Sequence, residues 1–166
     1  ISNTAGAWRY LIGDTIKFTN LKRCEIIITG RTKHFLSLCG EHLSVDNMNQ
    51  AIKQASEDLG ININEYCVVG KPYEGLFAHQ WYVGCDDAVD KNLFREKLDH
   101  HLKELNDDYA TERTSALKEV FVDMLPTDVF MEWMRAHGKL GGQHKFPRVL
   151  KKQQLEDWQK FLADRK

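Results

Sequence analysis

The sequence lacks long hydrophobic runs and an excess of charge of either sign. No apolar stretch approaches the roughly 20 residues that a membrane-spanning helix needs, and the N-terminus lacks the charged-then-apolar pattern of a signal peptide. Lys and Arg total 23 against 24 Asp and Glu, so no net field attracts nucleic acid or an anionic membrane over long range. We therefore expect a cytoplasmic protein that has neither nucleic acid nor a membrane as its partner.

Paired cysteines are also lacking. Cys24, Cys39, Cys67 and Cys85 are scattered through apolar or strand-like stretches and form no C-x-x-C pair, which indicates reduced and partly buried thiols. The 166 residues suffice for one domain with a remnant of a neighbour, but hardly for two full domains. Because the chain has no initiator Met and leads almost directly into strand-like sequence, we expect a segment of a longer protein.

Apolar residues recur with strand periods and helix periods in turn, which predicts an α+β fold. Ser44 is the expected N-cap of a helix that Gly60 ends, Asp90 opens a second helix, and Thr127 caps a later, short one. The predicted elements, in chain order, are strands at 15–18 and 25–29, a helix at 44–60, strands at 65–69 and 78–85 around a loop at 70–75, helices at 90–106 and 109–114, a strand at 117–125, and helices at 127–138 and around 155–162.

We expect a small mixed or antiparallel sheet built from the last three of these strands. The helices that begin at Ser44 and Asp90 should cover it, and Trp81, Trp133 and Trp158, which fall on apolar faces, should lie in the core. The first two strands should stand apart as a strand-pair remnant of a preceding domain, because the natural boundary lies near residues 31–34, where this pair ends.

Three short patterns can carry chemistry. Tyr10-Leu-Ile-Gly-Asp14 places a carboxylate after a glycine, where its oxygens can accept hydrogen bonds from both hydroxyls of a ribose. Arg31 follows a strand and a glycine, so it can contact a phosphate or a ribose. Lys145 lies in a glycine-rich loop, from which its ammonium group can swing onto a phosphate oxygen. Each pattern alone is at least as typical of a surface turn.

In this order, the three patterns resemble the C-terminal end of the adenylate-forming enzymes, in which a Tyr-x-x-Gly-Asp motif, a Gly-Arg hinge motif and a late lysine loop follow one another. More narrowly, the chain resembles the Gretchen Hagen family of acyl-acid amido synthetases, the auxin-responsive group, and within it the bacterial type. The narrower resemblance rests on Gly30-Arg-Thr…Leu36-Ser-Leu-Cys-Gly-Glu41, on Leu98-Asp99…Leu102…Asn106-Asp-Asp-Tyr109…Arg113, and on Gly142-Gln-His-Lys-Phe-Pro-Arg148.

The resemblance implies roles for individual residues. Asp14 would hold the adenosine ribose with Tyr10 beside it against the nucleotide, and Arg31 would lie at the junction of two domains. Lys33 matches the hinge position. Lys145 matches the lysine that reaches the α-phosphate and the substrate carboxylate, although its loop reads Gln-His-Lys-Phe-Pro-Arg where the superfamily commonly ends in Gly-Lys.

The resemblance also implies the rest of the enzyme. Residues 1–32 would end a large N-terminal adenylation domain, and residues 33–166 would form a mobile C-terminal α+β domain. The whole enzyme would use ATP and Mg²⁺ to adenylate a carboxylic acid and would transfer the acyl group to an amine, such as an amino acid. Because the phosphate loop and the acyl pocket of the family lie in the N-terminal domain, we expect this fragment to be inactive alone.

Other interpretations remain open. The chain can instead be a non-catalytic α+β module that binds a ligand or a protein and needs no preceding domain. His100 and His101 are adjacent on a predicted helix and are expected to point in different directions, which argues against a shared metal ion; we predict no metal ligand. Cys39 beside Glu41 and His42 imitates a thiol nucleophile with its base, but neighbouring loop residues rarely have the required geometry.

Overall fold

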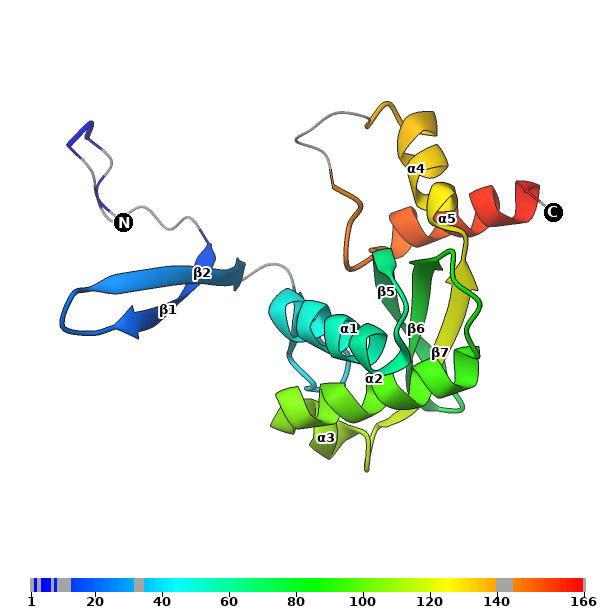
Figure 1. The fold of residues 1–166 in the computed structure, drawn as a ribbon, viewed down its shortest axis with the longest axis horizontal. Coiled ribbons are helices and arrows are strands. Elements are labelled where there is room, and N and C mark those ends of the chain that lie inside the picture. Colours follow the sequence, from blue (N-terminus) through cyan, green and yellow to red (C-terminus); the bar gives the residue numbers. More distant parts are fainter. Residues whose placement is uncertain are drawn as a thin grey trace.

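The computed structural model describes residues 2, 4–6, 8, 13–31, 35–139 and 145–165. It has the predicted α+β architecture (Figure 1). Within the described residues, no helix combines the length and the apolar character needed to cross a membrane. The elements are β1 (Asp14–Asn20), β2 (Glu25–Arg31), β3 (Phe35–Leu36), β4 (Leu43–Ser44), α1 (Val45–Leu59), β5 (Ile63–Tyr73), β6 (Leu76–Cys85), α2 (Lys91–Leu105), α3 (Asp107–Glu112), β7 (Leu117–Leu125), α4 (Thr127–Ala136) and α5 (Lys152–Asp164).

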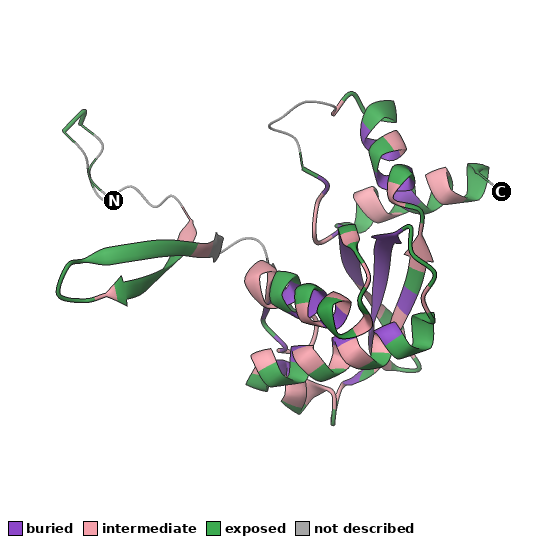
Figure 2. Cartoon of the chain, in the orientation of Figure 1, coloured by how far each residue is buried: buried purple, intermediate pink, exposed green. Residues whose placement is uncertain are grey.

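Strand β6 is the centre of a three-stranded sheet. It pairs with β5 in the antiparallel sense and with β7 in the parallel sense, so the sheet is mixed, as predicted. A parallel pair requires a crossover connection, which α2 and α3 supply. Strand β6 is buried along most of its length (Figure 2), because it has a strand on each side and side chains packed against both of its faces.

Two hydrophobic cores lie on opposite faces of this sheet. Successive residues of a strand point to opposite faces, so Trp81 and Val83 pack with α1 and α2, whereas Tyr82 packs with α4 and α5. The prediction that α1 and α2 cover the sheet is therefore confirmed. The three tryptophans predicted for the core, Trp81, Trp133 and Trp158, are all buried.

Both ends of α1 lie where the sequence predicts them. Ser44 Oγ accepts a hydrogen bond from the Asn47 N–H at 3.1 Å, and the Asn47 side chain accepts one from the Ser44 N–H at 3.2 Å, which is a reciprocal capping box. At the other end, Gly60 has a φ of 64°, the left-handed conformation that favours glycine. Local hydrogen bonding and backbone conformation therefore define where this helix begins and ends.

The loop predicted between β5 and β6 is mostly strand. The two strands run up to a two-residue turn, Glu74-Gly75, in which both residues have positive φ (47° and 77°), as in a type I′ hairpin turn. Pro72 lies inside β5, opposite Phe77. The Phe77 N–H donates to the Ala116 carbonyl on the β7 side, so the nitrogen of Pro72 faces the opposite, free edge, where proline removes no ladder hydrogen bond.

Helix α4 is capped differently from the prediction. Pro126 occupies the N-cap position, and Thr127 is the first helical residue. The Thr127 N–H donates to Asp86 Oδ1 at 2.9 Å, and this hydrogen bond lowers the pKa of the Asp86 carboxyl. The prediction that Thr127 caps the helix is wrong, because a carboxylate distant in the sequence supplies the acceptor. The helix ends before Gly138, which has a φ of 63°.

Gly70 in β5 leaves room for Leu38, a partly buried side chain from the loop before β4. A Cβ atom added at Gly70 would lie 2.1 Å from Leu38 Cδ1. We expect Gly70→Ala to lower the free energy of unfolding by about 1–3 kcal/mol, as overpacking usually does, and chemical denaturation measures this change. Leu38→Ala should cost less in the Gly70→Ala background than in the wild type. Equal costs in both backgrounds would show that the two side chains do not collide.

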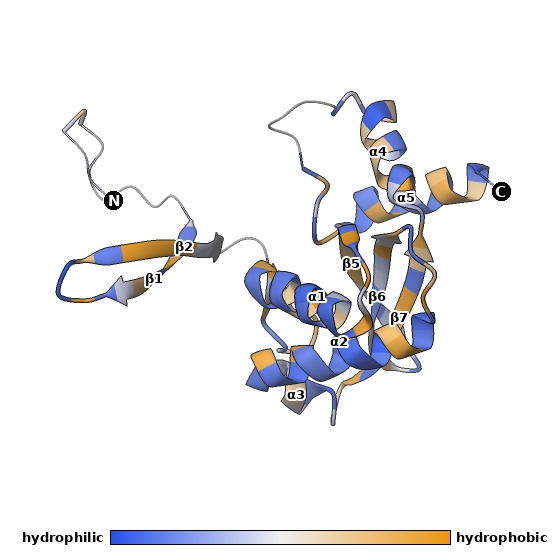
Figure 3. Cartoon of the chain, in the orientation of Figure 1, coloured by the Kyte–Doolittle hydropathy of each residue, from blue (hydrophilic) through white to orange (hydrophobic). Residues whose placement is uncertain are grey.

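Strands β1 and β2 form an antiparallel pair that is separate from the three-stranded sheet, as predicted (Figure 1). Ile16 lies opposite Ile28, and Phe18 lies opposite Ile26, so these four side chains share one face. We call them the hairpin face. Figure 3 colours the apolar residues of the strand pair orange along the ribbon. Each of the four is at least 49% exposed. A two-stranded hairpin is marginally stable by itself, and an exposed apolar face is typical of a surface that makes contacts with another part of a protein.

Candidate functional site

The structure pairs two of the residues predicted to bind nucleotide. Asp14 begins β1 and Arg31 ends β2, and their Cα atoms are direct partners in the antiparallel register. Gly13 has a φ of 77°, so the glycine of the motif provides a backbone conformation that other residues rarely adopt. The two residues therefore meet at the end of the strand pair away from its turn.

Lys145 extends from a firmly packed segment. The residue itself is exposed, but the next one, Phe146, is buried among aromatic side chains of α4 and α5. The ring centroid of Phe146 lies 5.0 Å from those of Phe130 and Trp133 and 5.1 Å from that of Trp158. This packing fixes the backbone beside Lys145 and leaves its ammonium group in solvent.

Arg148 attaches the same segment to the edge of β5. Its carbonyl accepts the Val68 N–H at 2.8 Å, and the Leu150 N–H donates to the Val68 carbonyl at 3.0 Å. Its guanidinium group donates to Glu65 and to the Tyr66 carbonyl and lies 4.3 Å from the centroid of the Tyr66 ring. Arg148, the last residue of the motif that contains Lys145, thus has a structural role.

The structure does not bring Lys145 to the other two candidates. Asp14 and Arg31 belong to the strand pair, whereas Lys145 precedes the stretch that lies against β5 and α5, and Figure 1 shows these as separate parts of the molecule. Tyr10 and Lys33 lie outside the described residues, as does the glycine-rich stretch at 140–144.

A buried carboxylate organises the loop before β4. Glu41 is fully buried, and its Oε1 lies 3.0 Å from Nε2 of His79 in β6. The carboxylate also accepts the backbone N–H groups of Leu38 and Cys39 at 2.9–3.0 Å. Burial by itself would raise the pKa of this carboxyl, but the hydrogen bonds from His79 and from backbone N–H groups lower it to about 2. Glu41 is therefore ionised at neutral pH and ties the loop to the sheet.

The same loop holds no activated thiol. Cys39 Sγ lies 3.5 Å from Glu41 Oε2, and burial together with the Glu41 charge raises the pKa of the Cys39 thiol to about 12. A thiol with this pKa stays protonated at neutral pH and is a poor nucleophile. His42 pairs with Asp108 at 3.3 Å, and the histidine that contacts Glu41 is His79.

Sequence reasoning missed the contact between Glu41 and His79. The two residues are 38 positions apart, and although Glu41 ends one of the family motifs, His79 belongs to none. The available signal was His79-Gln80 in the middle of a strand that is otherwise buried and apolar, because buried polar side chains require hydrogen-bond partners.

Comparison with known proteins connects this geometry with a family. Residues 46–154, well over half of the chain, match the model of the GH3 family C-terminal domain. The chain belongs to the GH3 family. Two similar solved structures are a GH3.15 acyl acid amido synthetase (TM-score 0.77, 17% identity) and the AtGH3.15 acyl acid amido synthetase in complex with 2,4-DB (TM-score 0.76, 18% identity), each matching 96% of this chain. The chain spans about a third of their lengths, 32% and 31%. No curated protein matches its sequence.

The GH3 motif residues of α2 and α3 form a structural network. Asp99 Oδ1 accepts hydrogen bonds from the Tyr109 hydroxyl at 2.7 Å and from Arg113 Nε at 2.8 Å, while its Oδ2 accepts one from Lys103 Nζ at 2.7 Å. Arg113 also donates to the Leu117 carbonyl at the start of β7. This part of the motif therefore fixes the crossover between β6 and β7.

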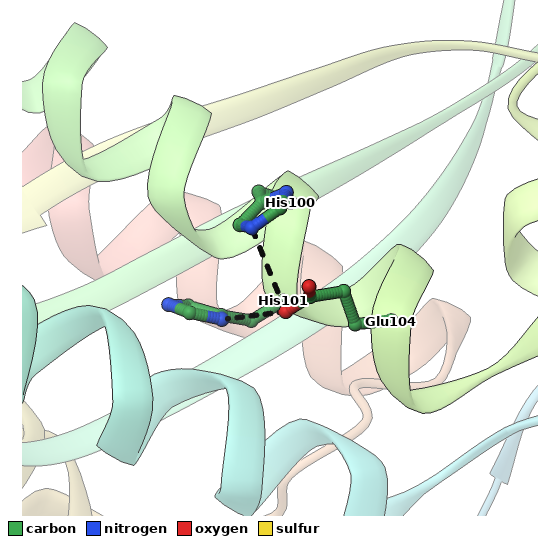
Figure 4. A group of neighbouring side chains, drawn as sticks. All are labelled: His100, His101 and Glu104. Carbon is green, nitrogen blue, oxygen red and sulfur yellow. Dashed lines mark hydrogen bonds and ion pairs between the residues drawn. The ribbon is translucent and has the colours of Figure 1, made fainter.

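Two histidines of this GH3 domain converge where the sequence predicted that they diverge. His100 Nε2 lies 3.5 Å from Glu104 Oε2, and His101 Nδ1 lies 3.4 Å from the same oxygen (Figure 4). The predicted divergence is wrong, because residues three and four positions apart are neighbours on a helix and Glu104 is reached from both histidines. In the described part of the chain, this is the one group of three His, Cys, Asp or Glu residues whose ligand atoms converge, all within 4.8 Å.

Proposed function

We propose that the chain is the C-terminal part of an ATP-dependent, AMP-forming ligase that adenylates a carboxylic acid and transfers the acyl group to an amine such as an amino acid. The observation that carries this proposal is the GH3 C-terminal domain, whose fold is shared by acyl acid amido synthetases about three times as long as this chain. ATP would be a co-substrate of the whole enzyme, and an N-terminal adenylation domain would supply the phosphate loop and the acyl pocket.

Residues 1–32 would end that N-terminal domain, and residues 33–166 would form the mobile C-terminal domain. The hairpin face supports this boundary. Its four apolar side chains are half exposed in this chain, and fully burying a side chain of this kind stabilises a protein by about 1.5–3 kcal/mol. A domain that precedes the hairpin and covers this face would gain that stabilisation.

Each candidate residue then has a proposed role. Asp14 would accept hydrogen bonds from the ribose of ATP, with Tyr10 against the nucleotide and Arg31 opposite Asp14 at the domain junction. Lys33 would be the hinge, and Lys145 would reach the α-phosphate and the substrate carboxylate. The cross-strand pairing of Asp14 with Arg31 and the exposure of Lys145 on an anchored segment support these roles. The resemblance implies Mg²⁺ with the ATP, and we assign no residue of this chain as its ligand.

An exchange assay on the full-length enzyme tests the proposed function. We expect a carboxylic acid to stimulate the exchange of labelled pyrophosphate into ATP, and Asp14→Asn to raise the KM for ATP. Asp157→Asn, a change at an exposed carboxylate of α5, is the matched control and should leave the KM unchanged. If no member of a broad panel of carboxylic acids stimulates exchange, the non-catalytic module becomes the better interpretation.

The 166-residue chain alone is expected to bind ATP with millimolar or weaker affinity. Asp14, Arg31 and Lys145 offer few polar contacts, and their gain is offset by the entropy lost when a ligand binds. Isothermal titration calorimetry measures the affinity, with the full-length enzyme as the positive control. Micromolar binding by the chain alone would contradict the proposal that another domain completes the nucleotide site.

A further inference from the structure

A cluster on α2 consists of His100, His101 and Glu104. None of these residues is assigned to the nucleotide site, so an inference about the cluster does not depend on the proposed function. The side chains of His100 and Glu104 are 60% and 59% exposed, whereas that of His101 is only 12% exposed. One member of the cluster is therefore held in place by its surroundings, and the other two are open to an ion arriving from solvent.

Two of the three distances among the ligand atoms match those between metal ligands. Distances of 3.4 and 3.5 Å between the histidine nitrogens and Glu104 Oε2 exceed the usual 2.7–3.2 Å range of N–H···O hydrogen bonds. Ligands bound at about 2.0–2.2 Å in a tetrahedron around Zn²⁺ lie roughly 3.3–3.5 Å from one another. The third distance, between the ligand nitrogens of His100 and His101, is at most 4.8 Å, so the three atoms face a common space.

Asp58 in the last turn of α1 orients His101, the least exposed of the three residues. Its Oδ2 lies 3.1 Å from His101 Nε2 and 3.1 Å from Lys97 Nζ. With Nε2–H donating to Asp58, the geometry assigns the free lone pair of His101 to Nδ1, the atom that faces Glu104. Histidines that bind metals usually donate their other ring N–H to a carboxylate in this way.

We propose that His100, His101 and Glu104 bind a divalent first-row transition-metal ion, with Zn²⁺ as the ion that best suits two imidazole nitrogens and one carboxylate oxygen. Mg²⁺ and Ca²⁺ fit poorly, because both prefer ligand sets made of oxygen atoms. Three protein ligands leave a coordination position for water. Through the contact between His101 and Asp58, the bound ion would also connect α2 to α1.

The test is a Zn²⁺ titration of the 166-residue chain without an affinity tag, in competition with a chromophoric chelator. We expect one equivalent of Zn²⁺ to bind. Loss of a carboxylate that orients a metal-binding histidine typically costs about 10–100-fold in affinity. Asp58→Asn should therefore weaken binding by about that factor, and His101→Ala, which removes the ligand itself, should weaken it by more. His137→Ala, a change at an exposed histidine near the end of α4, is the matched control and should bind as the wild type does.

Two further measurements distinguish the loss of a metal ligand from the loss of folded structure. Melting curves recorded without Zn²⁺ should coincide for the wild type and for His100→Ala and Glu104→Gln, whose side chains are largely exposed, so weaker binding by these variants reports lost ligands. On addition of Zn²⁺, the ring resonances of His100 and His101 should shift in NMR spectra while those of His137 do not. The proposal is overturned if the cluster variants bind Zn²⁺ as tightly as the wild type, if His137→Ala weakens binding equally, or if the wild type binds no Zn²⁺.

Discussion

Replacing Lys145 with Ala in the full-length enzyme is expected to slow carboxylate adenylation by about a hundredfold to a thousandfold, while the transfer of the acyl group to the amine changes far less. This expectation rests on the proposed function. Negative charge builds on the α-phosphate and the attacking carboxylate in the first transition state, so a positioned ammonium group lowers that barrier selectively. Rotation of the C-terminal domain about the junction at Arg31 to Lys33 would carry Lys145 away before the second step.

Two single-turnover assays separate these steps. Release of pyrophosphate from acid plus ATP reports the first step, and amide formation from pre-made acyl-adenylate reports the second. Lys152→Ala changes another exposed lysine, at the start of α5, and should affect neither rate. Equal losses in both steps for Lys145→Ala would mean that the residue is structural or that the loop does not move between steps. An unchanged first step would remove its catalytic assignment.

Replacing Glu41 with Gln is expected to lower the free energy of unfolding by about 3 kcal/mol at neutral pH, because each pKa unit below the ordinary value corresponds to about 1.4 kcal/mol. The amide keeps the size of the side chain but offers one oxygen, where the carboxylate accepts hydrogen bonds from Leu38, Cys39 and His79 on both of its oxygens. An NH₂ group facing backbone N–H groups would leave buried donors without acceptors.

The contribution of Glu41 should also depend on pH. The folded-state pKa of about 2 lies below the ordinary value of 4.5, so the stabilisation is fully present above about pH 4.5 and is lost as the pH falls toward 2. Urea denaturation at a series of pH values therefore should show a difference between wild type and Glu41→Gln that is large at pH 7 and shrinks below pH 4.5. Glu96→Gln, at an exposed glutamate of α2, should stay within about 0.5 kcal/mol of the wild type. A difference that is independent of pH would show that the charge of Glu41 is not what stabilises the loop.

Local signals in the sequence account for the elements that were predicted well. Helix α1 carries its own start and stop in Ser44 and Gly60, and both act through hydrogen bonds or backbone conformation within one turn. The extension of β5 through Pro72 was missed because proline and glycine normally break strands. Only the pairing partner reveals that Pro72 faces a free edge. The cap of α4 was missed for a similar reason, since Asp86 acts across a long stretch of sequence.

The candidate site, like the fold, could be predicted from the sequence only where the signal is local. The register that pairs Asp14 with Arg31 follows from two adjacent strands, and it places two residues together that the motifs had named separately. The charge of Glu41 and its contact with His79 depend on tertiary packing, which composition and periodicity do not reveal. The convergence of His100 and His101 was missed because helical spacing describes where side chains begin, whereas their ring nitrogens reach a common oxygen beyond the helix surface.

The parallel pairing of β6 with β7 bears on the order in which this domain folds. The β5–β6 hairpin pairs residues close in sequence, and local contacts of this kind favour fast folding. Residues paired between β6 and β7 are about 40 positions apart, so closing that loop has an entropic cost before any pairing offsets it. Asp99, Tyr109 and Arg113 lie inside this loop and tie its helices to the first residue of β7. We therefore expect substitutions at Asp99, Tyr109 or Arg113 to slow folding more than they speed unfolding.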